Sequence, residues 1–329
     1  MPDEFALIAR HFAPLSRGFP GAYGLRDDAA VITPAPGCEL VVKTDAIIAG
    51  IDFPPDEPAD LVARKALRVN LSDLAAKGAI PRAYLLDLMM PHSVDEGWIA
   101  AFAAGLAHDQ AEYGIHLIGG DMSATPGPTT IAVTALGEVP IGRIIRRGGA
   151  RAGDGVFVTG TIGDAALGLA VLRGELAELD AVSAAFLIDR YRVPQPRVTV
   201  GPELIGVGSA AIDVSDGVVA DLRHICEVSE LSAIIETLHL PLSGAARAAI
   251  AGDPRLLAAV LGGGDDYEIV FAASTLAADV IADLSRSSGV PIAQIGRMVA
   301  PPADADYEVC VIGRDGQRMI LASEGWAHF

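Results

Sequence analysis

The chain has 329 residues, 51% of them hydrophobic, and its 42 acidic against 24 basic residues leave a formal charge of −18. A surface this negative repels nucleic acids and anionic membranes unless a local basic patch intervenes. The four arginines between residues 143 and 151 are too few for a nucleic-acid stripe but sufficient to bind a phosphate. No apolar run reaches the roughly 18 residues of a membrane span. We therefore expect neither a nucleic-acid nor a membrane partner.

The N-terminal sequence and the spacing of the cysteines indicate in which cellular compartment the protein is expected. Acidic residues come early, and no positively charged start precedes a long apolar stretch, so we expect no signal peptide. Cys38, Cys226 and Cys310 are scattered and form no CxxC pair. This spacing argues against a disulfide framework and against a thiolate metal site, and it favours a cytoplasmic protein.

The hydrophobic pattern of the first half predicts alternating helices and strands. The predicted helices cover residues 3–12, 59–77 and 94–113, and the predicted strands cover residues 26–32, 39–44, 84–90 and 129–139. Residues 17–25 contain glycine and proline and are expected to form a loop. Acidic residues such as Asp45 and Asp121 are expected where a strand or a glycine turn ends.

Residues 147–154 are glycine-rich and precede a new strand, so we place a domain boundary between residues 148 and 149. The second half is predicted to contain helices at residues 163–172, 184–191, 218–228, 255–261 and 277–288, and strands at residues 155–159, 210–214, 267–272, 291–298 and 308–312. Hairpin-length connections are as frequent as crossovers, which favours two α+β domains, 1–148 and 149–329, over strict βαβ alternation.

The sequence NLSDLAAKGA at residues 70–79 gives one helix two different faces. Leu67, Leu71 and Leu74 recur with helical spacing, so they are expected to face a core. Asp73 lies on another stripe among apolar residues, where a carboxylate is costly to desolvate without a cation or hydrogen-bond donors. A structural interpretation pairs a half-solvated Asp73 with Lys77, four residues on. A functional interpretation makes Asp73 a ligand.

Asp73 belongs to one of five short acidic signatures that lie beside glycine, small or apolar residues. The signatures contain Asp27, Asp28, Asp45, Asp73, Asp121, Asp213 and Asp216. Carboxylates without histidine or cysteine companions favour Mg²⁺, Mn²⁺ or Ca²⁺ over zinc or copper. One Mg²⁺ uses only one or two protein carboxylates, so the set predicts several Mg²⁺ ions that bridge phosphates. Each acid also has a structural alternative, as a turn, a cap or a first-turn helix residue.

Three further segments bear on phosphate binding. Ser215 is expected to cap the helix that follows, with backbone N–H groups pointing toward an anion. The sequence GTIG at residues 160–163 follows a strand as phosphate loops do, but it lacks the lysine of the Walker motif, so we interpret it as a tight turn. Arg147 has a planar guanidinium that suits bidentate phosphate contact.

Taken in order, the motifs match a known family. They are DDAAV at residue 27, TDAIIAG at 44, KALRVNLSDLAAKGA at 65, GGD at 119, RRGGARAGD at 146, VTGTIGDAALGL at 158, AAIDVSDGVVADL at 210, GGGDDYE at 262 and GWAHF at 325. Over essentially its whole length the chain resembles the thiamine-monophosphate kinases, within the aminoimidazole ribonucleotide synthetase-like superfamily. The NLSDLAA and SDG signatures are shared across the superfamily, whereas GDDYE and the terminal GWAHF are specific to the kinases.

The resemblance implies the two-domain fold of this superfamily. An N-terminal domain for ATP, Mg²⁺ and dimerisation pairs across a homodimer into an intersubunit β-barrel, and a C-terminal α/β sandwich domain completes the active site. The implied reaction is ATP-dependent phosphorylation of thiamine monophosphate to thiamine diphosphate. A phosphate acceptor is already ionised near neutral pH, so direct in-line transfer needs no general base. Positioning and charge neutralisation then do most of the work.

The same resemblance assigns roles to residues of this chain. The implied metal ligands are Asp28, Thr44, Asp45, Asp73, Asp121, Asp213 and Asp216, of which Asp73, Asp121 and Asp216 are expected to be catalytic. The implied nucleotide contacts are Gly119, Gly120, Arg147 and Ser215. Asp52, Asp265 and Trp326 would lie toward the thiamine monophosphate.

Two positions depart from the family pattern. Arg26 stands where a glycine usually precedes the aspartate pair, which should affect loop geometry more than chemistry. Asp52, in the segment 50–53, stands where the family usually has a histidine that touches the substrate. Two alternatives therefore stay open: a related ATP-dependent enzyme with a different acceptor, and a non-catalytic nucleotide-binding protein.

Overall fold

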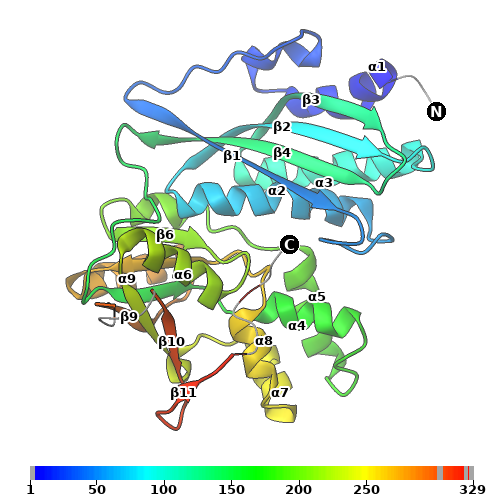
Figure 1. The fold of residues 1–329 in the computed structure, drawn as a ribbon. Helices are drawn as coiled ribbons and strands as arrows, with labels where there is room; N and C mark the ends of the chain where they lie inside the picture. Colours follow the sequence, from blue (N-terminus) through cyan, green and yellow to red (C-terminus); the bar gives the residue numbers. More distant parts are fainter. Residues whose placement is uncertain (1–3, 302–306, 322–324, 326–329) are drawn as a thin grey trace. The chain divides into compact units, whose positions relative to one another are not determined.

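A computed structural model of the chain describes residues 4–301, 307–321 and 325. The chain forms two compact units, each built around one β-sheet (Figure 1). Unit 1 contains Met1–Leu74 and Ala79–Gly142, and unit 2 contains Ala75–Gly78 and Arg143–Phe329. Two sheets with helices packed on them confirm the mixed α and β content predicted from the sequence.

The helices and strands of the described residues have the following bounds. The α-helices are α1 (Glu4–Leu7), α2 (Ala59–Ala76), α3 (Glu96–Tyr113), α4 (Asp164–Leu172), α5 (Ala181–Arg192), α6 (Val218–Ser229), α7 (Gly244–Gly252), α8 (Leu256–Gly262) and α9 (Ala278–Ser288). The strands are β1 (Cys38–Ile48), β2 (Ile80–Met90), β3 (His116–Ala124), β4 (Thr130–Pro140), β5 (Gly155–Thr159), β6 (Gly208–Asp213), β7 (Ser232–Glu236), β8 (Ile269–Ala273), β9 (Ile292–Val299), β10 (Val309–Ile312) and β11 (Arg318–Met319).

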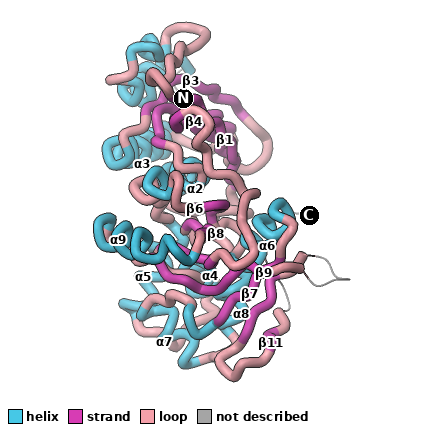
Figure 2. The backbone as a smooth tube through the Cα atoms, turned by 90° about the vertical axis from the view of Figure 1, so that its left-hand side faces the viewer, coloured by secondary structure: helices cyan, strands magenta, loops and turns pink. Residues whose placement is uncertain are grey.

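Unit 1 is a four-stranded sheet with two long helices on one face. The strand order is β1-β4-β2-β3, in which β2 and β3 run parallel and the other neighbours run antiparallel. Both α2 and α3 lie beneath the strands of unit 1 (Figures 1 and 2). Leu67, Leu71 and Leu74 of α2 are fully buried, which confirms the core face predicted for this helix.

The ends and packing of α3 follow from its sequence. Asp95 accepts a hydrogen bond from the Trp98 N–H at 2.8 Å and caps the start of the helix. Gly114, with φ of 66°, ends it in a left-handed conformation that glycine adopts readily. A buried ion pair, with Arg68 Nε 2.6 Å from Asp109 Oδ2, ties α2 to α3. This pair holds in place the helix that carries Asp73.

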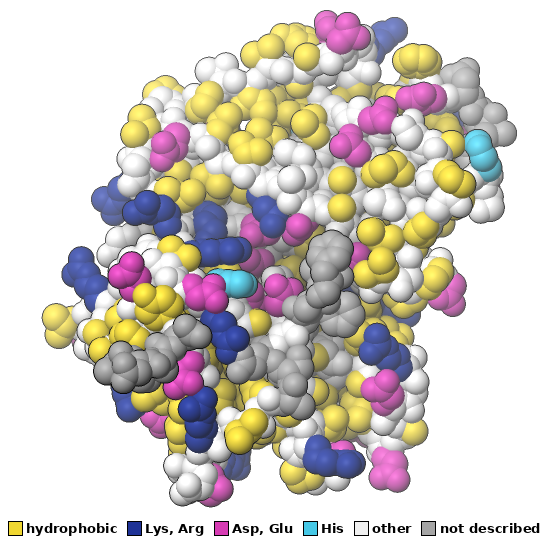
Figure 3. Space-filling view, viewed as in Figure 1, with side chains coloured by type: hydrophobic (Ala, Val, Ile, Leu, Met, Phe, Trp, Pro, Cys, Tyr) yellow, Lys and Arg dark blue, Asp and Glu magenta, His cyan; other side chains and the backbone are white. Residues whose placement is uncertain are grey.

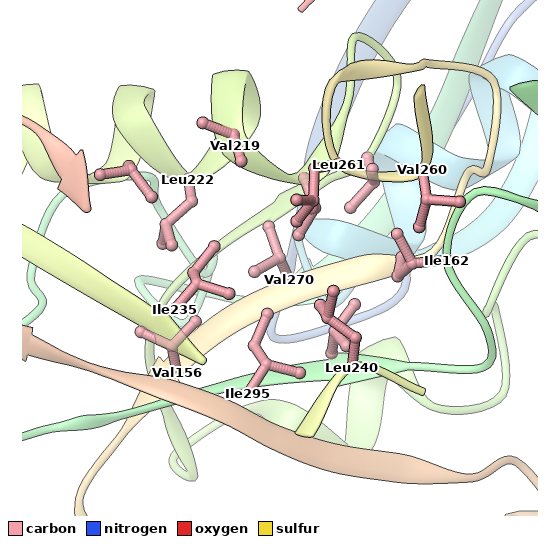
Figure 4. Close-up of a cluster of buried hydrophobic side chains, with 14 of the residues drawn as sticks. Val156, Ile162, Val219, Leu222, Ile235, Leu240, Val260, Leu261, Val270 and Ile295 are labelled. Carbon is pink, nitrogen blue, oxygen red and sulfur yellow. The ribbon is translucent and has the colours of Figure 1, made fainter. Parts of the chain in front are cut away.

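Unit 2 contains a seven-stranded sheet with a hydrophobic core on each face. The strand order is β11-β10-β7-β9-β5-β8-β6, and α6 and α9 lie on opposite sides of it (Figure 2). Because side chains alternate along a strand, Val156 faces one core and Phe157 faces the other. In the first core, Val219 and Leu222 point from α6 toward strand residues such as Ile235 (Figure 4). The start of α6 is therefore anchored by apolar packing.

Most of the predicted elements are present with slightly different ends, but the strand predicted at residues 26–32 is wrong. These residues form bends and irregular backbone. The Val31 N–H donates to the Gly21 carbonyl at 2.9 Å, and the partly buried Ala30 packs against the cluster that contains Ala83. The apolar residues of this segment thus cover part of the sheet without joining its ladder of hydrogen bonds.

Four of the helices and strands given above were not predicted, namely β3, β7, α7 and β11. The α7 sequence, GAARAAIAG, consists mainly of alanine and glycine, so its helical periodicity is weak. β7 and β11 are five and two residues long, too short for a clear alternating pattern. Among the described residues, no helix combines the length and the apolar character that crossing a membrane requires.

Candidate active site

A cavity in unit 1 combines acidic, glycine and apolar residues. It encloses about 170 Å³ and its lining includes Asp27, Asp28, Gly119, Gly120 and Asp121, together with the apolar side chains of Ile8, Phe12, Leu25 and Leu117. Gly120 has φ of 147°, and a Cβ at this position would lie 1.8 Å from the Leu86 carbonyl oxygen, so the backbone requires glycine. The structure therefore brings Asp28, Asp121 and the glycine pair to one cavity.

A second group of predicted residues lies between β1 and α2. Lys43 Nζ is 2.8 Å from Asp73 Oδ2 and 3.2 Å from Asp45 Oδ2, so one ammonium joins two predicted metal ligands. Burial acts to lower the pKa of Lys43, but the carboxylates of Asp73 and Asp45 outweigh it and hold that pKa above its ordinary value. Lys77, the partner in the structural interpretation of Asp73, donates to the Ala211 carbonyl at 2.7 Å.

Three predicted ligands of unit 1 lie inside strands. Thr44 and Asp45 belong to β1 and Asp121 to β3, so the expectation that a strand or a glycine turn ends at these acids is wrong for Asp45 and Asp121. Asp213, in contrast, does end its strand. Both strands form edges of the four-stranded sheet, and all three residues are exposed. Thr134 Oγ1 donates to Thr44 Oγ1 at 3.1 Å, and Ser123 Oγ donates to Asp121 Oδ2 at 2.7 Å. Neighbouring hydroxyl groups thus orient two of the three side chains.

Asp52 lies in the turn that follows β1. Its Oδ2 accepts a hydrogen bond from the Ile48 N–H at 2.8 Å, and its carbonyl oxygen accepts one from Lys65 Nζ at 3.0 Å. The Asp52 N–H in turn donates to the Ile48 carbonyl at 2.9 Å. The Asp52 carboxylate therefore stabilises its own turn, in addition to any contact with a ligand.

In unit 2, three predicted residues lie where β6 leads into α6. Asp213 is the last residue of β6, and Ser215 and Asp216 follow it before α6 begins at Val218. The helix is capped by Gly217, whose φ is 123°, so the prediction that Ser215 caps α6 is wrong. The capping residue thus lies two residues further along the chain than the sequence pattern indicated.

Asp221 provides the physical reason for this different cap. Its buried Oδ2 accepts hydrogen bonds from the N–H groups of Asp216 at 3.0 Å and Gly217 at 3.1 Å. These N–H groups therefore bind a carboxylate of the protein itself, and the anion contact expected from a capping Ser215 would have to come from its side chain. Burial, followed by the negative charge of Asp216, raises the pKa of Asp221 to about 7.

The loop that contains Asp265 is hydrogen-bonded to the loop that contains Ser215. The Asp265 N–H donates to the Ser215 carbonyl, the Tyr267 N–H to the Val214 carbonyl and the Val214 N–H to the Glu268 carbonyl, each at 2.8 Å. Asp265 and Tyr267 have φ of 70° and 50°, a left-handed conformation that residues other than glycine seldom adopt. Such a backbone persists where its surroundings determine it, and it often does so at functional sites.

A buried ion-pair centre supports this second loop. The Glu268 carboxylate accepts hydrogen bonds from Arg190 Nη2 at 2.9 Å, Arg197 Nε at 2.6 Å and Thr159 Oγ1 at 2.7 Å, and a further one from Arg197 Nη2. Asp266 beside it is also buried and accepts a hydrogen bond from the backbone before α4 at 2.6 Å. Burial raises the pKa of Asp266 well above its ordinary value.

Two predicted residues remain, Arg147 near the start of unit 2 and Trp326 near the end of the sequence. Arg147 is exposed, and the carbonyl of the preceding Arg146 accepts a hydrogen bond from β6 at 3.0 Å. Trp326 lies outside the described residues. The adjacent Gly325 packs closely on the loop between β6 and α6. A Cβ at this position would lie 3.1 Å from the Asp216 carbonyl oxygen.

Three residues of these groups were missed from the sequence. Lys43 lies two residues before Asp45, and alternation along a strand could have placed both on one face. Asp221 interrupts the apolar stripe of α6, which is a recognisable signal for a buried carboxylate. Glu268 had no local signal, because its arginine partners are 78 and 71 residues away in the chain.

Comparison with known proteins gives the class first. Residues 26–139, nearly all of them in unit 1, match the family model described as AIR synthase related protein, N-terminal domain. Solved structures of similar fold extend this likeness through both units, with coverage of 96% of the chain in the example below. The chain thus contains an AIR-synthase-related N-terminal domain, and several of its predicted carboxylate ligands lie in that domain.

Full-length relatives define the particular family. A thiamine-monophosphate kinase from Caulobacter vibrioides is 42% identical over 330 residues, which cover 99% of this chain and 91% of that protein. The crystal structure of thiamine-monophosphate kinase from Stenotrophomonas maltophilia K279a aligns with a TM-score of 0.84 at 38% identity, over 96% of this chain and 98% of that chain. The structure of AaThiL complexed with AMPPCP and TMP aligns with a TM-score of 0.76 at 28% identity, over 90% and 89%. The chain belongs to the thiamine-monophosphate kinase family.

Proposed function

We propose that the protein transfers the γ-phosphoryl group of ATP directly to thiamine monophosphate and so forms thiamine diphosphate. Family membership supports this reaction, and the relative AaThiL is complexed with AMPPCP and TMP. Within this chain, the observation that carries the proposal is the pairing of Asp45 and Asp73 on a single cation, Lys43 Nζ. Two carboxylates that can share a cation are suited to the divalent ions that accompany ATP.

The acceptor is itself a phosphate, which determines what the protein must do. Its oxygen is already ionised near neutral pH, so the site has to position and neutralise charge and need not remove a proton. Gly119 and Gly120 would present backbone to the nucleotide phosphates, and the Arg147 guanidinium would pair with a phosphate. Ser215 would contact the nucleotide through its hydroxyl group.

The donor set fits Mg²⁺. Every proposed ligand offers a hard oxygen atom, and Asp45 and Asp73 can approach one cation together. Several ions would be held by Asp28, Thr44, Asp45, Asp73, Asp121, Asp213 and Asp216. When bound, Mg²⁺ neutralises the charge that separates ATP from an anionic acceptor. Asp73, Asp121 and Asp216 are the carboxylates that we assign to catalysis.

The acceptor end of the site is assigned to Asp52, Asp265 and Trp326. Thiamine monophosphate has a positively charged thiazolium ring, and a carboxylate near that ring attracts it by about 1 kcal/mol or more. Asp265 is suited to this role because its loop is held by backbone hydrogen bonds and by buried Glu268. A carboxylate at Asp265 would therefore favour an acceptor, such as thiamine monophosphate, that has a positive charge at one end.

We further propose that the protein is a homodimer that acts in the cytoplasm, with unit 1 forming the interface and an intersubunit barrel. The N-terminal domain, 1–148, would bind ATP and Mg²⁺, and the C-terminal domain, 149–329, would complete the active site. The sheet of unit 1 has helices on one face, while its other face exposes Val42 and Leu85. Figure 3 shows hydrophobic side chains gathered over the strands of unit 1. A second copy of the sheet would cover them.

The direct test is a coupled assay of ADP release with Mg²⁺, ATP and a panel of phosphate monoesters. We expect turnover with thiamine monophosphate, strict dependence on Mg²⁺ or Mn²⁺, and formation of thiamine diphosphate detected by chromatography. Release of ADP with another monoester but not with thiamine monophosphate would point to a changed acceptor. Binding of ATP without turnover of any monoester would favour a nucleotide-binding protein.

A further inference from the structure

Lys43 places a cation of the protein itself between two carboxylates that are assigned to metal binding. Its Nζ lies 2.8 Å from Asp73 and 3.2 Å from Asp45. We propose that Lys43 lowers the affinity of this carboxylate pair for divalent cations, because its ammonium already occupies the space that they share. The inference rests on the proposed function, in which Asp45 and Asp73 hold Mg²⁺.

The position of Lys43 follows from the geometry of β1. Alternation along the strand puts Lys43 and Asp45 on one face, whereas Thr44 points the other way and bonds to Thr134. The side chains of Lys43 and Asp73 are 28% and 15% exposed, so this ion pair is less screened by water than a surface pair. The ammonium is therefore held at the pair before any ligand arrives.

The charge of Lys43 opposes a divalent ion at the same place. Two carboxylates alone present a charge of about −2, and the ammonium leaves about −1 to attract an incoming cation. The ammonium also repels a dication directly at a separation of a few ångströms. Together these effects are sufficient to weaken divalent binding by roughly tenfold or more.

Two consequences follow for the nucleotide-free protein. The carboxylates stay paired and oriented, because an ammonium satisfies both of them. At the same time the pair binds free Mg²⁺ or Mn²⁺ weakly. Lys43 is thus a residue that sets the metal affinity of the site, and it acts through Asp45 and Asp73.

The test measures Mn²⁺ binding without nucleotide, by the loss of the free Mn²⁺ signal in electron paramagnetic resonance. We expect Lys43→Gln to bind Mn²⁺ roughly tenfold more tightly than the wild type at one class of site. Lys43→Arg keeps the positive charge and should bind Mn²⁺ as the wild type does. Combining Lys43→Gln with Asp73→Asn should remove the gain, because the pair then has one carboxylate.

Arg82→Gln is the matched control for a general effect of charge. Arg82 lies on β2 of the same sheet and pairs with Glu138, outside the proposed site. An equal gain in Arg82→Gln, or unchanged Mn²⁺ affinity in Lys43→Gln, would overturn the inference. Thermal unfolding checks that each variant is folded, and Lys43→Met is the second neutral variant if Lys43→Gln is not. Wild-type protein that fails to phosphorylate thiamine monophosphate contradicts the proposed function, while the Mn²⁺ titration is judged separately.

Discussion

At the scale of single residues, the proposed ligands differ from other acids in how they are held. Asp73 is mostly buried and paired with Lys43, whereas Asp56, in the loop after β1, is exposed. Asp73→Asn keeps the size of the side chain but loses a charge, so we expect kcat to fall by roughly a hundredfold or more, with the fold retained. Steady-state kinetics and thermal unfolding measure the two effects. Asp56→Asn is the control and should behave as the wild type; near-native turnover of Asp73→Asn would remove it from the catalytic set.

Asp221 holds the loop that carries Asp216 through the backbone of that loop. Its carboxylate binds two consecutive N–H groups of that loop through a single oxygen. Asp221→Ala removes both hydrogen bonds and should lower kcat by roughly a hundredfold, because a displacement of about 1 Å in a catalytic group has an effect of that size. Asp221→Asn retains an oxygen that can accept both hydrogen bonds and should stay within a few-fold of the wild type. Equal kcat values for the two variants would show that Asp221 has only a structural role.

At the scale of elements, the loop of Asp265 depends on a buried ion-pair centre. Glu268 is fully buried between Arg190 and Arg197, whereas Glu236 pairs with Arg297 at the surface. Glu268→Gln leaves two guanidinium groups without a full counter-charge, so we expect the free energy of unfolding to fall by about 3–5 kcal/mol. Glu236→Gln should lower it by at most about 1 kcal/mol. Urea denaturation followed by circular dichroism compares them, and similar losses would contradict the assigned importance of the buried centre.

Asp164 at the start of α4 links the stability of unit 2 to pH. It is buried and accepts hydrogen bonds from Thr161 and Ser243, each at 2.5 Å, and burial raises its pKa above the ordinary value. A raised pKa means that the folded state holds a proton which the unfolded state has released. The contribution of Asp164 to stability is therefore greatest at low pH and is lost as pH rises toward the raised pKa.

The corresponding variant is Asp164→Asn, which does not titrate. Its free energy of unfolding should improve relative to the wild type as pH rises above the ordinary pKa of an aspartate, about 4. Urea denaturation of both proteins across that range measures the difference. A difference that is independent of pH would show that Asp164 is ionised equally in the folded and unfolded states.

The sequence predicted the helices and strands better than it predicted the contacts between distant residues. Leu67, Leu71 and Leu74 were placed correctly because helical periodicity is a local property. The strand predicted at residues 26–32 failed because a strand needs a partner, and its apolar residues found a cluster to cover instead. The cap at Ser215 failed because Asp221, several residues later, competes for the same N–H groups. The sequence around a buried charged residue does not show which distant groups pair with it or form hydrogen bonds to it.

At the scale of the whole molecule, the outer face of the unit 1 sheet determines the expected assembly. Val42 is 61% exposed and lies on the face opposite the helices, beside Thr44 and its partner Thr134. If a second copy covers this face, Val42→Asp buries an unpaired carboxylate at the interface and should convert the dimer to a monomer at micromolar concentration. Multi-angle light scattering measures the mass of each form.

The matched control for this last variant is Leu276→Asp, at a residue of unit 2 that is 93% exposed. It adds the same charge to an apolar surface residue and should leave the dimer intact. A monomeric wild type would contradict the proposed assembly outright. A dimer that persists in Val42→Asp would place the interface elsewhere, because a single sheet face cannot accommodate a new carboxylate on both sides of a symmetric contact without loss of affinity.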